Sequence, residues 1–539
     1  MGETAMSKKL YYNGTILTMD DSCPRADYVL TEDDRILSVG KSCDMPDDLA
    51  AGAQPVDLCG RMLLPGFIDS HLHMLTAALN RLKLDISDRH FASVEDMLSY
   101  VRREKEGSGE AWISVFGFSE ENLDDGRMVT RQDIDQVFPD VPVTIIRVCG
   151  HMCIVNSQVI SRLDPKKMES IQGGAFIKDA SGSYTGLATE GAQQYVLDSM
   201  PEADPEVVQR YLLQEQGLLL RCGITAIHDA GTDMMLPRAY AEAYEEMEHR
   251  GALQLRTYLM VRPGDGEPAE EFEHWLTDLK ARHPAGRLKI GSVKLFADGS
   301  FGSRTAAVNE HYQDQPENTG LLLQHRLDAY TTYLADRGHQ VAVHAIGDRA
   351  TGYVVSLYAA STGKDTARLR IEHAELLDNQ LIETIRLNHL LIMTQPIFVR
   401  EFGTTYFNNL GPRRAMHIQP LRTLLDRGLQ VGFGTDYPVD DPNPLLGIHT
   451  AMTREIKNSD RLLNPAESIT FEEAVRCYTL HNAIGSFDEA SMGSIRAGKY
   501  ADFVILSGIE PLPDGTVASI SSAQVEQTVI GGEAVYTRA

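Results

Sequence analysis

The sequence predicts an α/β fold: a (β/α)8 TIM barrel with an inserted subdomain and a small composite β-sandwich built from both chain ends. Three observations support this prediction. Eight short apolar runs alternate with helix-length segments between about residues 66 and 488, which is typical of repeated βα units and a parallel sheet. Strand-like segments flank this region at both ends of the 539-residue chain. About 150 residues separate the first two runs, far more than one crossover helix requires.

The two chain ends carry the flanking strand-like segments. Residues 8–66 alternate apolar runs with turn residues such as Asn13-Gly14, and similar runs return near the end of the chain. Because the termini of a domain commonly lie close together, we expect one composite β-sandwich from residues 1–66 and 489–539. Residues 67–488 would then form the barrel, inserted between the two halves of the sandwich.

Eight segments are predicted as barrel strands because each is a short apolar run bounded by turn residues. In chain order they are residues 66–74, 223–231, 253–261, 288–299, 340–348, 369–375, 389–396 and 429–438. After the last of them, Thr470 and Glu473 have the spacing of a capping box at the start of a final helix. The active site of such a barrel lies at the carboxyl ends of its strands.

The gap between the first two strands predicts a subdomain inserted at about residues 85–215. Within it, residues 141–157 have the pattern of a strand running into a helix. Residues 176–197 predict a hairpin that turns at Ser181-Gly182 and continues into a helix.

Composition excludes several functional classes. Apolar residues make up 43% of the chain and charged residues 23%, which excludes a disordered or fibrous protein. A formal net charge of −26 would repel nucleic acids and anionic lipids. We therefore expect a small-molecule substrate, with no nucleic-acid partner and no membrane partner.

Cysteine usage and the first residues bear on cellular location. Seven cysteines, without paired metal-binding spacings, indicate buried thiols in a reducing compartment. The first twenty residues lack the apolar run of a signal peptide, and no stretch approaches the roughly 20 apolar residues of a membrane span. We expect a cytoplasmic protein. Its oligomeric state is open, a homodimer being the commonest default.

His71 and His73 are the first candidate metal ligands. They are two residues apart at the end of a predicted strand, so both imidazoles point to the same face. The alternative is a pair of histidines on a half-polar strand face. Three further candidates end other predicted strands, namely His344, His373 and Asp436, and their spacings suit one and two βα units.

Lys294 lies among apolar neighbours near the end of the fourth predicted strand. A lone ammonium there would be costly to bury unless it were paired or modified. Carboxylation by carbon dioxide would convert it into an anionic bridge between two cations. The alternatives are a lysine that reaches the surface or one that pairs with Asp298.

Several segments together resemble the amidohydrolase superfamily, and specifically its YtcJ-like amidohydrolase family 3 branch of metal-dependent hydrolases, which includes N-substituted formamide deformylase. These segments are GFIDSHLHM, KLFADG, VHAIGD, RIEHAE, GTDYPV and GSIRAGKYADFVIL. The resemblance implies a binuclear metal centre with two divalent ions, zinc being the first choice. It further implies His71 and His73 on one ion, carboxylated Lys294 as the bridge, His344 and His373 on the other ion, and Asp436 beside the hydrolytic water.

The activity implied is hydrolysis of an amide-type C–N bond, other than a peptide bond, in an N-acyl or N-formyl small molecule. Metal-activated hydroxide attacks the carbonyl, with Asp436 as general base and then general acid. One alternative is a mononuclear deaminase of an aminated heterocycle, which would need no bridging lysine. Another is a non-catalytic metal-dependent binding or regulatory protein. Mixed nitrogen and oxygen ligands also accept manganese, iron or nickel.

Five further residues are weaker candidates for substrate binding: His151, Asn156, Glu190, His228 and Arg304. The first three lie in motifs of the insertion that resemble those of the family, although helix capping would also explain them. His228 ends the second predicted strand and could instead be a core histidine bonded to Asp229. Arg304 lies in a glycine-rich loop after the fourth strand, where it could also be a solvated loop residue.

Overall fold

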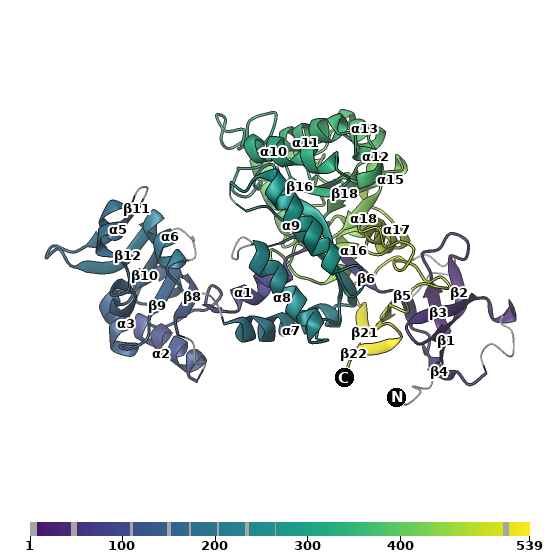
Figure 1. The fold of residues 1–539 in the computed structure, drawn as a ribbon, viewed down its shortest axis with the longest axis horizontal. Coiled ribbons are helices and arrows are strands. Elements are labelled where there is room, and N and C mark those ends of the chain that lie inside the picture. The colour runs from purple at the N-terminus through teal and green to yellow at the C-terminus, as the bar shows by residue number, and fades with distance from the viewer. Residues whose placement is uncertain are drawn as a thin grey trace. The chain divides into compact units, whose positions relative to one another are not determined.

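The computed structural model describes residues 8–44, 51–107, 111–147, 152–171, 174–201, 204–231, 237–264, 266–509 and 517–539. It divides into two compact units (Figure 1). One comprises Met1–Ala77 with Leu212–Ala539, and the other comprises Ala78–Tyr211.

The first unit contains the barrel. Its eight parallel strands pair in chain order, and all eight predicted strands are confirmed. They are β6 (Phe67–Leu72), β13 (Ile224–Asp229), β14 (Arg256–Val261), β15 (Leu288–Phe296), β16 (Val341–Ala345), β17 (Arg370–His373), β18 (Leu391–Thr394) and β19 (Val431–Phe433).

Two backbone hydrogen bonds connect the last strand to the first. The amide of Asp436 donates to the carbonyl of His71 at 2.7 Å, and the amide of His73 donates to the carbonyl of Tyr437 at 2.7 Å. These bonds form just beyond the carboxyl ends of the two strands. They therefore hold three candidate ligands at the point where the barrel closes.

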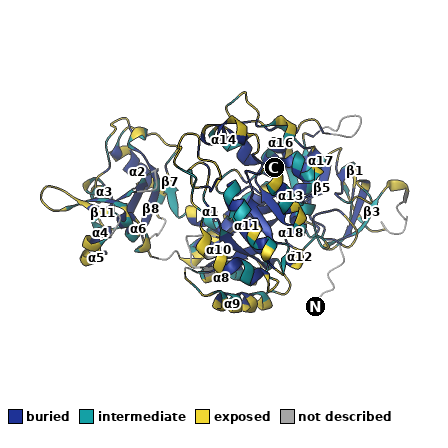
Figure 2. Ribbon diagram, turned by 90° about the horizontal axis from the view of Figure 1, so that it is seen from above, coloured by how far each residue is buried: buried dark blue, intermediate teal, exposed yellow. Residues whose placement is uncertain are grey.

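Helices cover the barrel because each buries one apolar stripe. In α9 (Ala269–Arg282), for example, Phe272, Leu276 and Leu279 are buried at helical spacing, and the opposite face is exposed (Figure 2). The others are α1 (Met74–Asn80), α7 (Pro205–Arg221), α8 (Pro237–His249), α10 (Gln324–Ala335), α11 (Asp348–Ala360), α12 (Lys364–Ala367), α13 (Asn379–Leu387), α14 (Ile397–Ala415), α15 (Leu421–Asp426), α16 (Pro444–Thr453), α17 (Phe471–Cys477) and α18 (Leu480–Gly485). The predicted capping box of Thr470 and Glu473 is present at the start of α17.

Strands from both chain ends form one branched eight-stranded sheet, so the expected extra sheet domain is confirmed (Figure 1). Its main path runs β22 (Glu533–Thr537), β21 (Gln524–Ile530), β20 (Phe503–Ser507), β5 (Met62–Pro65), β1 (Lys8–Leu17), β2 (Arg25–Glu32) and β3 (Arg35–Gly40), with β4 (Gln54–Asp57) paired to β1. Tyr11 and Phe503, from opposite ends of the chain, meet edge to face with ring centroids 5.4 Å apart. The ion pair of Arg256 with Asp502 ties this sheet to the start of β14.

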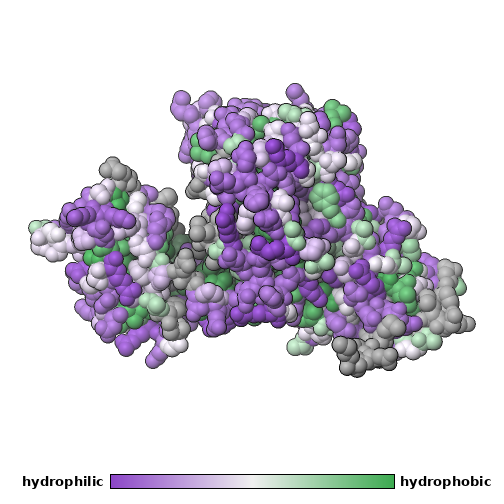
Figure 3. Space-filling model, viewed as in Figure 1, coloured by the Kyte–Doolittle hydropathy of each residue, from purple (hydrophilic) through white to green (hydrophobic). Residues whose placement is uncertain are grey.

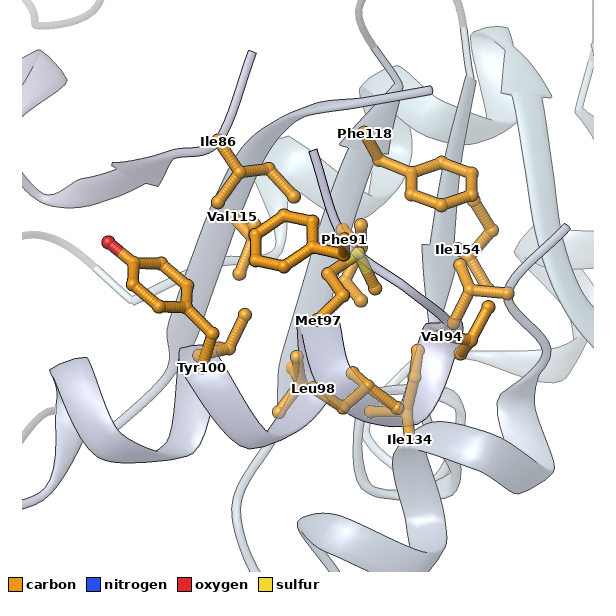
Figure 4. Packing of buried hydrophobic residues seen from close by; sticks show 14 of the residues in the cluster. Ile86, Phe91, Val94, Met97, Leu98, Tyr100, Val115, Phe118, Ile134 and Ile154 are labelled. Carbon is orange, nitrogen blue, oxygen red and sulfur yellow. The ribbon is translucent and has the colours of Figure 1, made fainter. Parts of the chain in front are cut away.

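The second unit, Ala78–Tyr211, has its own sheet and core. The strand order is β11 (Gly174–Lys178), β12 (Tyr184–Glu190), β10 (Met152–Val155), β9 (Val143–Arg147), β8 (Ile113–Phe118) and β7 (Lys83–Asp85). Figure 4 shows side chains of α2 (Val94–Lys105), among them Met97 and Leu98, packed together with Phe91, Phe118 and Ile134. The remaining helices are α3 (Arg131–Val137), α4 (Ser157–Ile160), α5 (Pro165–Ser170) and α6 (Gly191–Asp198).

One local prediction in this unit is wrong and another is confirmed. Within residues 141–157, the described segments Val143–Arg147 and Met152–Val155 pair as two antiparallel strands, β9 and β10, before the short helix α4. The β-branched and apolar residues of 152–155 favour a strand, so the helix starts only after Asn156. The predicted hairpin is present as β11 and β12, with Gly182 at φ +82 between them, and α6 follows.

The surface in Figure 3 is predominantly hydrophilic. Among the described residues, no helix is both long and apolar enough to cross a bilayer. The six cysteines in the described ranges are free thiols. Cys153 and Cys477 are buried as expected, whereas Cys43 and Cys59 are exposed, so the expectation of buried thiols holds only in part.

Candidate metal centre

The six predicted metal-site residues come together at the carboxyl ends of five barrel strands. His71 and His73 belong to β6 and the residue after it, Lys294 to β15, His344 to β16, His373 to β17, and Asp436 follows β19. The four imidazoles form a continuous row. Ring centroids are 5.4 Å apart for His73 and His71, 4.8 Å for His71 and His373, and 4.4 Å for His373 and His344.

His71, His73 and Asp436 form the tightest group. Oδ1 of Asp436 lies 3.1 Å from Nε2 of His73 and 3.6 Å from Nε2 of His71, and one donor atom from each residue lies within 4.8 Å of the others. This oxygen is buried, yet no donor in the described part of the chain makes a hydrogen bond to it. Two imidazole nitrogens and a carboxylate oxygen facing one another in this way fit a divalent cation.

Each histidine of the row has one ring nitrogen bonded to a protein acceptor. The Nδ1–H group donates in three of them, from His71 to Glu372, from His73 to the carbonyl of Gly231 at 2.6 Å, and from His373 to Oε1 of Gln395 at 2.8 Å. In His344 the Nε2–H group donates to the carbonyl of Gly299 at 3.0 Å. Such acceptors fix the tautomer and leave the other nitrogen with a lone pair for a metal.

The charge state of these groups also suits metal binding. Burial lowers the pKa of His71, His344 and His373, which keeps these three imidazoles neutral. In His73 the carboxylate of Asp436 outweighs burial and raises the pKa. Burial alone would raise the pKa of Asp436. The neighbouring His73 and His71 outweigh this effect and hold the pKa of this carboxyl below its ordinary value. The aspartate is therefore ionised at neutral pH.

Lys294 is 1% exposed, and its Nζ lies 3.0 Å from Nε2 of His71. The alternative of a lysine that reaches the surface is therefore wrong. Burial lowers the pKa of this amine to about 8, although Glu372 and Asp436 act to raise it. Asp298 does not serve as its partner but accepts backbone hydrogen bonds, from Ala307, Ile346 and Gly347.

A cavity of about 1200 Å³ adjoins Lys294. Its wall combines the basic residues Arg262 and His325 and the acidic residues Asp298 and Asp328 with apolar groups, including Pro263, Phe296, Leu322 and Leu323. Arg262 is not among the residues predicted from the sequence. Because Arg262 directly follows β14, the rule that located the other strand-end residues could have found it.

His228 is fully buried inside the barrel and is not bonded to Asp229. Its Nδ1 accepts a hydrogen bond from Nη1 of Arg370 at 3.0 Å. Asp229 instead accepts hydrogen bonds from the hydroxyl groups of Tyr240 and Tyr244. These bonds and its burial give no support for a direct contact between His228 and substrate.

The side chain of Arg304 is bonded to its own loop and to α14. Its guanidinium makes hydrogen bonds to Asp314 at 2.9 and 2.6 Å and to Oδ1 of Asn409 at 3.1 Å. These contacts indicate a role in holding the loop after β15, rather than the predicted contact with substrate.

The insertion candidates lie in the second unit. Asn156 is fully buried and caps α4, where its Oδ1 accepts from the amides of Val143 and Val159. Its amide nitrogen donates to two further carbonyls, which indicates a structural role. Glu190 is exposed at the junction of β12 and α6, with φ +47 and no side-chain cap. His151 lies outside the described residues.

Known proteins are similar to this chain over most of its length. The profile of the Amidohydrolase family matches residues 54–536. YtcJ of Bacillus subtilis (strain 168) is 30% identical over 98% of this chain and 100% of its own. The N-substituted formamide deformylase of Arthrobacter pascens is 25% identical over 99% of both chains.

A solved structure shares the fold. An uncharacterized metal-dependent hydrolase from Pyrococcus furiosus superimposes with a TM-score of 0.74 at 27% identity, covering 92% of this chain and 98% of that one. The match of the family profile covers all eight barrel strands and the second unit. The chain belongs to the amidohydrolase family.

Proposed function

We propose that the protein is a metal-dependent amidohydrolase that hydrolyses an amide-type C–N bond, other than a peptide bond, in an N-acyl or N-formyl small molecule. The observation that carries this proposal is the convergence of His71, His73 and Asp436, with Oδ1 of Asp436 buried 3.1 Å from Nε2 of His73 and 3.6 Å from Nε2 of His71. Family membership supports the hydrolytic reaction, and the similarity to a formamide deformylase supports the class of bond.

The proposed centre holds two divalent ions. His71 and His73 would bind one ion, and His344 and His373 the other, with Lys294 as the bridge and Asp436 beside the first ion. The contact of 3.0 Å between Lys294 and His71 and the continuous row of imidazoles support this assignment. Donors of nitrogen and oxygen suit zinc, and equally manganese, iron or nickel.

The bridge requires a carbamate on Lys294. In its formation the neutral amine attacks carbon dioxide, a new N–C bond forms, and the nitrogen loses one proton to solvent. A pKa of about 8 leaves roughly a tenth of this amine neutral at pH 7, whereas an ordinary lysine is almost fully protonated. The burial that lowers the pKa therefore favours the modification.

Asp436 would move the proton during hydrolysis. Bound divalent ions would supply Lewis acidity, which makes water nucleophilic at neutral pH and polarises the scissile carbonyl. The ionised carboxylate of Asp436 takes a proton from the attacking water and returns it to the departing nitrogen. Its backbone amide is bonded to the carbonyl of His71, which fixes the carboxylate beside the ligands.

The cavity beside Lys294 would bind the substrate. Phe296, Leu322 and Leu323 offer an apolar surface for an acyl group or its carrier, and Arg262 offers a donor for a carbonyl or carboxylate oxygen. The volume of about 1200 Å³ suits a small molecule.

The test combines metal analysis of the purified protein with a panel of N-formyl, N-acetyl and N-acylamino acid compounds. We expect two equivalents of metal per chain and release of a carboxylic acid and an amine in equal amounts. Ammonia release from aminated heterocycles with one metal per chain would favour the deaminase instead. Metal-loaded protein that binds these compounds without turnover would favour a binding or regulatory role.

A further inference from the structure

A continuous chain of hydrogen bonds starts at the edge of the His71 ring opposite Lys294. Nδ1 of His71 donates to Oε2 of Glu372. Arg370 donates two hydrogen bonds to the same carboxylate, from Nε to Oε1 at 2.8 Å and from Nη2 to Oε2 at 3.1 Å. Nη1 of Arg370 then donates to Nδ1 of His228 at 3.0 Å. The chain joins three strands, β6, β17 and β13, inside the barrel.

Nη2 of Arg370 also donates to the carbonyl of Ser70 at 2.9 Å, next to His71 in β6. Arg370 and Glu372 are two residues apart in β17, so both side chains point to the same face of the strand. The arginine therefore connects, through hydrogen bonds, the carboxylate of Glu372 and the backbone of the strand that carries His71.

This charged pair is fully buried, with Arg370 and Glu372 both 0% exposed. Barrel interiors are ordinarily filled by branched apolar side chains. A buried ion pair is weak as a source of stability, because desolvation of the two charges offsets much of their attraction. Its presence in the core is better explained by a task that requires a carboxylate at this position.

We propose that Glu372 is a positioning residue for the metal centre, which holds the His71 ring through Nδ1 so that its Nε2 lone pair faces the cation, and that Arg370 holds Glu372. The inference rests on the metal centre of the proposed function. It assigns roles to two charged residues that contact neither the proposed metal nor the substrate cavity.

The carboxylate has two effects on its partner. It fixes the tautomer, so that Nε2 carries no proton and lies 3.0 Å from Nζ of Lys294 and 3.6 Å from Oδ1 of Asp436. It also makes the imidazole a stronger electron donor toward a metal. Without it, the ring could turn or adopt the other tautomer, which would place a proton where the cation binds.

The test measures metal affinity of the metal-free full-length protein by competition with a chromophoric chelator. For Glu372→Gln, which retains a hydrogen-bond acceptor but removes the charge, we expect an affinity for Zn²⁺ roughly 10- to 100-fold weaker than that of the wild type. Glu372→Leu should weaken it further, because no acceptor remains. Glu372→Asp, which restores the charge, should recover part of the loss.

Asp502→Asn provides a control, because it breaks another pair of an arginine with a carboxylate, in which the carboxylate is buried and the arginine is partly exposed. Asp502 binds Arg256 at 2.7 and 3.1 Å and has no contact with the metal-site histidines among the described bonds. This variant should lower the thermal midpoint and leave metal affinity within about twofold of the wild type. The double variant Arg370→Met with Glu372→Leu removes the ion pair without an orphaned charge, and should recover stability but not metal affinity.

Folded Glu372→Gln and Glu372→Leu variants with wild-type metal affinity would overturn the positioning role. Recovery of full affinity in the double variant would overturn it as well, because stability alone would then explain the loss. A wild-type protein that binds metal tightly but hydrolyses none of the compounds would contradict only the proposed function. A wild-type protein that binds no metal would contradict both.

Discussion

The hydroxyl group of Thr435 donates a 2.6 Å hydrogen bond to Oδ2 of Asp69, and the amide of Thr435 donates to Oδ1 of the same carboxylate at 3.2 Å. Asp69 lies in β6 and also accepts from the amide of His71 at 3.0 Å. One buried carboxylate thus connects the first strand of the barrel with the segment after the last one. His71 and Asp436 stand on either side of this connection.

Replacement of Thr435 with valine should lower the free energy of unfolding by about 1–3 kcal/mol, because a buried carboxylate oxygen loses its donor at nearly constant side-chain volume. Urea denaturation measures this change. Thr423→Val is a suitable comparison, since the hydroxyl group of Thr423 donates to Glu467 in a half-buried setting. This variant should lower the free energy of unfolding by less than Thr435→Val does. Equal stability of Thr435→Val and the wild type would contradict the role of this bond.

Asp69 should make the stability of the metal-free protein depend on pH. Burial raises the pKa of Asp69 to about 7, although hydrogen bonds from Thr435 and His71 act to lower it. Between its ordinary value of 3.8 and about 7, the folded state binds more protons than the unfolded state, so this group's contribution to stability falls as pH rises. The destabilisation caused by Asp69→Asn should therefore shrink from about pH 5 to about pH 7, as urea titrations would show. A constant difference across that range would count against the prediction.

Asp436→Asn should reduce kcat by roughly 10²- to 10⁴-fold, because the amide cannot accept and return the proton. Its metal content should fall much less than its activity, since the histidines, Lys294 and the amide oxygen of the new asparagine remain. Steady-state rates and elemental analysis measure the two quantities. Asp426→Asn removes an exposed carboxylate of α15 and should leave both unchanged. Near-native turnover in metal-loaded Asp436→Asn would rule out the proton-transfer role.

Metal removal should lower the thermal midpoint, because a cation that binds only the folded state stabilises it by about 4 kcal/mol when present at 1,000 times its dissociation constant. Dialysis against a chelator followed by calorimetry provides the measurement, and added Zn²⁺ or Mn²⁺ should restore the midpoint together with activity. Identical unfolding curves with and without the chelator would argue against a structural contribution of the metal.

Lys294→Met should abolish the carbamate bridge, and we expect metal content to fall from two equivalents to one or fewer. Reconstitution of the wild-type protein should be slow in carbon dioxide-depleted buffer and faster with added bicarbonate. Lys289→Met, in the same strand, removes an ammonium that pairs with Asp488 at 2.8 Å and should retain full metal content. Two tightly bound metals in Lys294→Met would exclude a bridging lysine.

The barrel strands could be predicted because each is a short apolar run between turn residues, and the predicted site residues could be found because parallel strands end at a common face. Local chemistry also placed the capping box of Thr470 and Glu473. The split of residues 141–157 into two strands could not be predicted reliably, since short apolar runs suit strand and helix alike. The position of Arg304 in a loop does not reveal that its guanidinium forms an ion pair with Asp314.

Sequence by itself determined the barrel, the extra sheet from both chain ends and the residue types near the strand ends, because periodicity and chain order are local properties. Only the tertiary structure decided which side chains pair. It showed that His71 is hydrogen-bonded to Glu372, Glu372 to Arg370, and Arg370 to His228, across strands far apart in the chain. It also showed that Lys294 is buried and that the carboxylate of Asp298 accepts hydrogen bonds from backbone amides. Partner choice among buried polar groups depends on burial and distance in three dimensions, which the order of residues does not contain.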